Sequence, residues 1–76
     1  MGNTGIIKYY NPNKGYGFIK NIYAEEEIFF HISDVYEYEK EKINENIVVV
    51  YSKDKDKKQR DKAINISIPA MVKKKQ

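Results

Sequence analysis

Alternating apolar and polar positions dominate the first half of the chain and predict short β-strands. In residues 14–20 (KGYGFIK), Tyr16 and Phe18 fall on the same face, because alternate side chains of a strand point the same way. In a second aromatic stretch, Phe29 and His31 likewise share a face. If the two strands pair, these four side chains form one patch with apolar residues behind it. Such a patch is typical of a platform on which nucleotide bases stack.

Five strands of this kind follow one another along the chain. The runs rich in β-branched and aromatic residues cover residues 5–10, 14–20, 27–32, 47–51 and 62–68. Five short strands in so small a chain indicate a barrel, because closure removes exposed sheet edges. The fold class expected is therefore all-β, a five-stranded antiparallel OB-fold barrel. Its apolar lining is predicted to be Ile6, Ile19, Ile28, Phe30, Val49, Ile64 and Ile66.

The connections between these strands are polar. Residues 11–13 (NPN) are a turn signal, because Pro fixes φ and Asn tolerates unusual backbone angles. Ser33 and Asp34 offer a helix cap, and residues 33–36 can form a short helical turn. Residues 36–46 alternate glutamate with aromatic or basic residues. Such a run can be a long loop or a ragged helix, and we favour a loop anchored by Ile43. Residues 52–61 are predicted to be a charged connection.

Length and composition limit the classes of protein to consider. The chain has 76 residues and no cysteine, which excludes disulfides and cysteine-based metal sites. No apolar run approaches the roughly 18 residues of a membrane span, and the first ten residues lack the segments of a secretory signal. We therefore expect a soluble, cytoplasmic protein. The expected organisation is one domain over residues 1–68 and a basic, flexible tail at 69–76.

Positive charge is concentrated near the C-terminus. Residues 52–76 carry nine Lys and Arg against three Asp, whereas residues 1–51 carry five Lys against eight Asp and Glu. A basic segment is a common electrostatic footprint for nucleic acid. Lysine-rich loops and tails also keep small domains in solution, so charge alone leaves both interpretations open.

The aromatic patch has a structural alternative, since aromatic residues favour strands in any protein. Two observations favour stacking. The opposite face already carries an apolar set, so a second aromatic face is exposed and calls for an explanation. His31 also shares a face with an aromatic residue, which suits a flat, partly polar stacking residue. Lysines beside the patch can hold phosphates, and the glycines of residues 14–17 leave space for a base. These lysines are Lys8, Lys14 and Lys20.

The same residues resemble the cold-shock domain family. KGYGFI at 14–19 is similar to its first ribonucleoprotein motif, and EIFFHIS at 27–33 is similar to its second. GIIKYYN at 5–11 looks like the opening strand of the family, and weaker similarity extends to about residue 67. The resemblance implies a five-stranded barrel that binds single-stranded RNA or DNA, commonly as an RNA chaperone. It implies neither catalysis nor a cofactor.

The resemblance also implies particular site residues. Carried over position by position, the binding face comprises Lys8, Tyr9, Asn11, Lys14, Tyr16, Phe18, Phe29 and His31. The family's long loop usually offers a further aromatic, a role for which Tyr38 is the candidate and Tyr36 the alternative. In the basic connection we add Lys58 and Arg60.

Two positions depart from the family pattern and reduce the stacking surface. Tyr9 stands where the family has tryptophan, and Ile32 stands where it usually has phenylalanine. The usual Gly-Pro near the C-terminus is replaced by Arg60-Asp61, within a connection that is unusually basic. We therefore expect weaker stacking than the family's usual level and more reliance on charge.

Other functions have less support. The glutamates at 25–27 and 37–45 are compatible with a protein-interaction module that repels nucleic acid. A hydrolase or nuclease is disfavoured, because the chain has one histidine, no cysteine and no cluster of metal ligands. We expect no membrane or small-molecule partner. A monomer is expected, with weak dimerisation left open.

Overall fold

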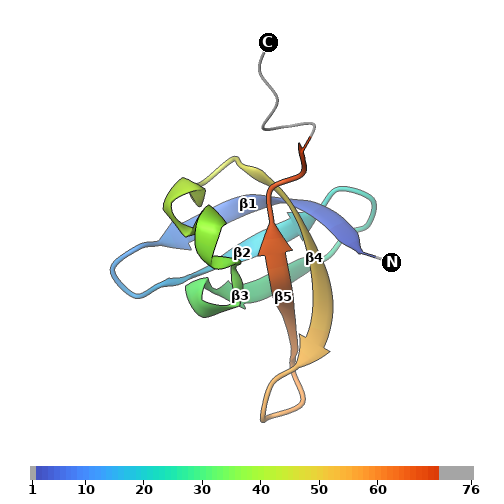
Figure 1. The fold of residues 1–76 in the computed structure, drawn as a ribbon. Coiled ribbons are helices and arrows are strands. Elements are labelled where there is room, and N and C mark those ends of the chain that lie inside the picture. Colours follow the sequence, from blue (N-terminus) through green and yellow to red (C-terminus); the bar gives the residue numbers. More distant parts are fainter. Residues whose placement is uncertain (1, 71–76) are drawn as a thin grey trace.

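The computed structural model describes residues 2–70, which contain five β-strands and two short 3₁₀ helices. The elements in chain order are β1 (Asn3–Asn11), β2 (Tyr16–Asn21), β3 (Glu27–His31), η1 (Ile32–Asp34), η2 (Glu37–Lys42), β4 (Val48–Lys55) and β5 (Asp61–Ser67). The strands close into a barrel in the order β1-β2-β3-β5-β4 (Figure 1). The all-β, five-stranded barrel expected from the sequence is thus confirmed. The part of the tail beyond residue 70 lies outside the described residues.

One pairing of the barrel corrects the expected antiparallel arrangement. The β1·β2, β2·β3, β1·β4 and β4·β5 pairs are antiparallel, but β3 and β5 run parallel. The reason is geometric. A ring with an odd number of strands cannot alternate direction all the way round, so a closed five-stranded barrel must contain a parallel pair. Its parallel register joins Phe29 to Lys62.

The interior of the barrel confirms most of the predicted lining. Ile19, Ile28, Phe30, Val49 and Ile66 are all buried. Further buried residues are Ile7, Val35, Ile43, Tyr51, Ala63 and Ile68. The core is therefore complete without any contribution from the outward-facing aromatic residues of β2 and β3.

The prediction that Ile6 and Ile64 belong to the buried lining is wrong, and backbone irregularities explain both cases. In β1 the buried residue is Ile7, whereas Ile6 is only half-buried. In β5 the register shifts against β4, and Asn65 has a φ of 53°. This kink interrupts the alternation of β5, so Ile64 is half-buried while Ile66 is fully buried. A regular period of two therefore does not hold along either strand.

Two predicted connections contain regular structure. The segment expected to be a loop at 36–46 contains η2, which is one 3₁₀ helix of six residues. Ile43 is buried directly after it, as expected for an anchor. The charged connection at 52–61 is largely the far end of the β4–β5 hairpin, because β4 continues to Lys55. Lys55 pairs with Asp61 across this hairpin, with a distance of 2.8 Å from Nζ to Oδ1.

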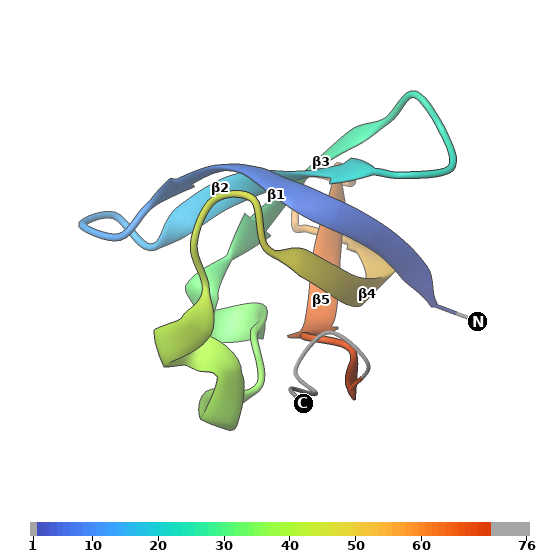
Figure 2. The ribbon, with the colours of Figure 1, turned by 90° about the horizontal axis from the view of Figure 1, so that it is seen from above.

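Figure 2 shows the two ends of the barrel. The 3₁₀ helices lie at one end, and the loop between β2 and β3 projects at the opposite end. Over residues 2–70, no helix is long and apolar enough to cross a membrane. The same residues contain no group of three or more His, Asp or Glu side chains placed to hold a metal ion.

Candidate nucleic-acid interface

The outer faces of β1, β2 and β3 carry two neighbouring rows of side chains. In each row one residue of β2 lies between its partners on β1 and β3, since β2 is the middle strand of the three. The rows are Asn11–Tyr16–His31 and Tyr9–Phe18–Phe29. The expected juxtaposition of Tyr16, Phe18, Phe29 and His31 is confirmed, and Tyr9 joins them from β1. We call these five residues the aromatic patch.

The rings of the aromatic patch lie close together but are not stacked on one another. The centroids of Phe18 and Phe29 are 6.0 Å apart with an interplanar angle of 71°, and those of Tyr16 and Phe18 are 6.4 Å apart with an angle of 87°. Tyr9 lies 6.1 Å from Tyr16 at a tilt of 53°. Phe18 and Phe29 each keep 37% of their surface exposed. Because neighbours meet them edge-on or tilted, the ring surfaces are accessible to a ligand.

A bulge in β1 explains why Tyr9 belongs to the patch. Ile7 pairs with Ile19 and Tyr9 pairs with Phe18, so Lys8 is an extra residue in β1. Without this extra residue, Tyr9 and Ile7 would point to the same side of the strand. The bulge reverses the alternation, which turns Tyr9 outward. Tyr10 then packs inward against Phe30, with ring centroids 5.9 Å apart and an interplanar angle of 17°.

Gly17 is required by the fold rather than by a ligand. A Cβ atom at this position would overlap the backbone carbonyl oxygen of Tyr9 and lie 2.8 Å from the Phe30 ring. The β1 backbone thus crosses β2 at a distance that only glycine allows. The sequence-based idea that Gly17 leaves space for a base is wrong, because this glycine is buried on the inner side.

Asn11 and Gly15 shape the β1–β2 turn beside the patch. The Asn11 side-chain oxygen accepts hydrogen bonds from the Asn13 and Lys14 amides, at 3.0 and 3.1 Å. Its Nδ2 donates to the Tyr9 hydroxyl at 3.3 Å. Gly15 adopts a φ of 74°, a conformation that favours glycine. Asn11 therefore holds both the turn and a ring of the patch.

His31 is held in a fixed orientation at the end of β3. Its Nδ1 accepts a hydrogen bond from the Ser33 amide at 3.1 Å and lies 3.0 Å from Ser33 Oγ. This contact caps η1, a role that the sequence suggested for Ser33 and Asp34. Because Nδ1 accepts from an amide, the proton of the neutral ring is on Nε2. The imidazole thus presents a fixed face beside Tyr16.

Arg60 lies beside the patch at the tip of the β4–β5 hairpin. It shares a pocket of about 330 Å³ with Phe29 and Glu27. Asp56 orders this tip, because its carboxylate accepts hydrogen bonds from the amides of Arg60 and Lys58 and from Arg60 Nε, at 2.8 to 3.0 Å. These contacts, of which the hydrogen bond from the Arg60 backbone amide has the largest effect, lower the pKa of the Asp56 carboxyl. Lys58 is exposed on the same turn.

The two candidate loop aromatics lie side by side. Tyr36 and Tyr38 stack on each other, with centroids 5.9 Å apart and an interplanar angle of 9°. Tyr38, on η2, is 69% exposed. The sequence interpretation also missed Lys62, which the parallel pairing places opposite Phe29. Its Nζ lies 3.6 Å from Asp34 Oδ2. Only the register of the β3–β5 pair reveals this neighbour.

Comparisons with known proteins agree with this geometry. Cold shock-like protein CspJ from Salmonella typhimurium and from Salmonella typhi is 37% identical over 41 residues. That alignment covers 54% of this chain, and it spans 59% of the length of these curated relatives. The solved structure of Drosophila Unr CSD456 superposes with a TM-score of 0.72 at 25% identity, over 92% of this chain and 28% of that one.

A family model described as the "cold-shock" DNA-binding domain matches residues 3–69. The match includes all five strands of the barrel and every residue of the aromatic patch. This chain therefore belongs to the cold-shock domain family.

Proposed function

We propose that this protein binds single-stranded RNA or DNA by stacking bases on the aromatic patch and holding phosphates with the cations around it. The observation that carries the proposal is the pair of side-chain rows across β1, β2 and β3. Exposed aromatic rings at this density are unusual on a small domain whose core is already complete. Each base stacked on such a ring contributes about 1–3 kcal/mol to binding, with little dependence on the sequence of the nucleic acid.

The proposed roles follow the positions of the side chains. Bases stack on the patch, and Asn11 positions the ring of Tyr9. Tyr38 extends the stacking surface on η2. Phosphates are held by cations in the β1 bulge, in the β1–β2 turn and at the tip of the β4–β5 hairpin. These cations are Lys8, Lys14, Lys58 and Arg60.

The biological role that fits this chemistry is that of an RNA chaperone, which keeps transcripts single-stranded without catalysing a reaction. Stacking platforms bind unpaired bases and tolerate many sequences, which is what such a role requires. The domain over residues 1–68 suffices for this activity as a monomer in the cytoplasm, and the residues from 69 onward add positive charge.

Titration with a fluorescent oligothymidine at low salt tests the proposal. Phe18→Ala and Phe29→Ala each remove a platform, so each is expected to weaken binding by about 5-fold or more. Phe18→Tyr and Phe29→Tyr keep the rings and serve as matched controls with near-normal affinity. Circular dichroism checks that all four variants are folded.

Two outcomes contradict the proposal. If the wild-type protein does not bind the strand at low salt, the patch serves another class of ligand, such as a polypeptide. If the alanine variants are unfolded while the tyrosine variants are intact, the two rings are part of the hydrophobic core.

A further inference from the structure

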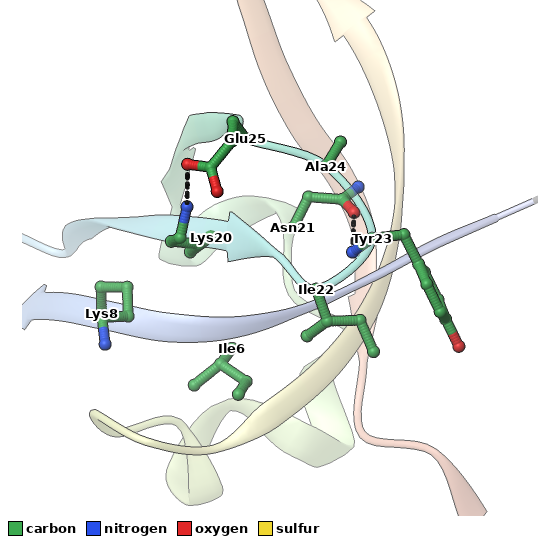
Figure 3. Close-up of a pocket in the computed structure, with 8 residues that line it drawn as sticks. All are labelled: Ile6, Lys8, Lys20, Asn21, Ile22, Tyr23, Ala24 and Glu25. Atoms are coloured by element: carbon green, nitrogen blue, oxygen red, sulfur yellow. Dashed lines mark hydrogen bonds and ion pairs between the residues drawn. The ribbon is translucent and has the colours of Figure 1, made fainter.

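A pocket of about 440 Å³ is lined by residues of β1, the end of β2 and the β2–β3 loop. This loop lies at the end of the barrel opposite the 3₁₀ helices (Figure 2). Its volume is within the range of small-molecule sites, roughly 300–1,000 Å³. Figure 3 shows its walls: Ile6 and Lys8 extend from β1, Lys20 lies near the end of β2, and Ile22 and Tyr23 come from the loop.

This pocket continues the outer face that carries the aromatic patch. Ile6 pairs with Lys20, and Lys20 pairs with Glu27 on β3. Lys20 comes two residues after Phe18, so both side chains point to the same side of β2. The row Ile6–Lys20–Glu27 therefore lies directly beside the row that contains Phe18. A strand that follows the patch along β2 in this direction reaches the pocket.

The loop exposes apolar surface that the fold does not use. Tyr23 is 83% exposed and Ile22 is 46% exposed. Turns of this kind usually carry small or polar residues, and the barrel core is complete without either side chain. Together with the half-buried Ile6, they give the pocket an apolar wall next to two lysines.

The loop is also held in place before any ligand arrives. The Asn21 side-chain oxygen accepts a hydrogen bond from the Tyr23 amide at 2.7 Å. The backbone amide of Asn21 donates to the Glu26 carbonyl at 2.9 Å, and the backbone amide of Ile22 donates to the Thr4 carbonyl at 3.0 Å. These bonds fix the backbone that carries Tyr23, which reduces the entropy lost when a ligand binds.

The side chains that line the pocket carry one net positive charge, and Glu27 pairs with Lys20 just outside this lining. Lys8 and Lys20 both line it, and Glu25 is the acidic residue that shares its wall. Glu25 Oε1 lies 3.1 Å from Lys20 Nζ (Figure 3), and its side chain is almost fully exposed. Ion pairs this exposed contribute little stability, so a phosphate can replace this carboxylate. The neighbouring Glu26 is held 3.0 Å from Lys53 Nζ.

We propose that this pocket is a further nucleotide subsite, which takes the base that follows those on the aromatic patch. The base stacks on Tyr23 against the apolar wall of Ile6 and Ile22, and Lys8 and Lys20 hold its phosphate. A nucleic acid is favoured over a polypeptide because the pocket continues the stacking face and carries two lysines. This inference rests on the proposed function, since it extends the same binding site.

Oligothymidines of increasing length, from about 4 to 16 nucleotides, test the subsite, because single OB-folds bind within this range. Strands too short to reach the pocket bind the wild type and Tyr23→Ala equally. Longer strands bind Tyr23→Ala about 5-fold more weakly, and Tyr23→Phe, the matched control, keeps the wild-type affinity. Glu25→Gln frees Lys20 and strengthens binding of the long strands alone. In the wild type, NMR signals of the 21–25 amides shift with long strands only.

The outcomes separate the two proposals. If the wild type binds short strands but Tyr23→Ala loses no affinity at any length, the subsite is refuted and the aromatic patch stands. The same conclusion follows if the 21–25 amides do not shift with the longest strand, and the loop then remains a surface for a protein partner. If the wild type binds no strand of any length, the proposed function itself fails.

Discussion

The buried pair of Asn21 and Tyr51 offers the sharpest test of how the barrel holds the β2–β3 loop. Asn21 Nδ2 donates a hydrogen bond to the Tyr51 hydroxyl at 3.1 Å. Only 8% of Asn21 and 2% of Tyr51 are exposed. The other end of the Asn21 amide accepts from the Tyr23 backbone. One side chain thus connects the barrel interior to the loop of the proposed subsite.

Asn21→Ala is expected to destabilise the protein by about 1.5–4.5 kcal/mol. The Tyr51 hydroxyl loses its partner inside the barrel, which costs about 1–3 kcal/mol. Loss of the bond to the Tyr23 amide adds about 0.5–1.5 kcal/mol. A domain of 76 residues has a total stability of roughly 4–11 kcal/mol, from about 0.05–0.15 kcal/mol per residue. The variant therefore retains only part of its stability, and measurements belong at low temperature.

A double-mutant cycle isolates the contact. Tyr51→Phe alone leaves the Asn21 amide without its acceptor and costs about 1–3 kcal/mol. In the double variant both hydrogen-bonding groups are absent, so neither remains buried without a partner. The combined loss of stability is therefore smaller than the sum of the two single losses by about 0.5–3 kcal/mol. Urea unfolding followed by circular dichroism gives the free energies, and Asn13→Ala in the exposed β1–β2 turn is the control. Strict additivity would refute the coupling.

Three other predictions concern close packing, pH and salt. Gly17→Ala should lower the free energy of unfolding in urea by more than about 3 kcal/mol, above the usual cost of overpacking, because the β1 backbone blocks the new methyl group. The control Gly2→Ala should be neutral, because its methyl group meets only an ordinary contact of 3.5 Å. Burial raises the pKa of Tyr51 above 10.0. The contribution of Tyr51 to stability is therefore present below pH 10 and is lost as pH rises through the folded-state pKa. If Tyr51→Phe loses as much stability as the wild type at alkaline pH, this prediction is contradicted. Lys58→Gln should lower the slope of log K against log salt by about 0.7, and an unchanged slope would exclude a phosphate contact.

The aromatic patch was predictable from the sequence because its two central strands are regular. Tyr16 and Phe18 alternate with Gly17 and Ile19, and β2 pairs with β3 without a shift in register. A period of two then fixes which side chains share a face. The same rule identified most of the core, including Ile19, Ile28 and Phe30, which alternate with the outward-facing side chains of β2 and β3.

The contribution of β1 was not predictable in this way. Ile6 and Ile7 are both apolar, so the pattern does not say which of them points inward. The bulge at Lys8 decides it, and the bulge depends on how β1 meets β2 in three dimensions. Asn65 in β5 has the same effect on Ile64 and Ile66. Local sequence pattern cannot locate such irregularities, because they arise from pairing between distant segments.

The proposed binding mode gives a bound strand a path that depends on which rings are exposed. Ile32, at the position where the family usually has phenylalanine, is half-buried against the core and offers no stacking surface. At the opposite end of the same face, Tyr23 adds a ring that the family comparison alone does not reveal. In the proposed binding mode each stacked ring contributes about 1–3 kcal/mol, so losing a platform near η1 and gaining one at the β2–β3 loop would move the favoured path of the strand toward that loop. Tyr23→Ala should therefore cost this protein more affinity for long strands than Ile32→Ala.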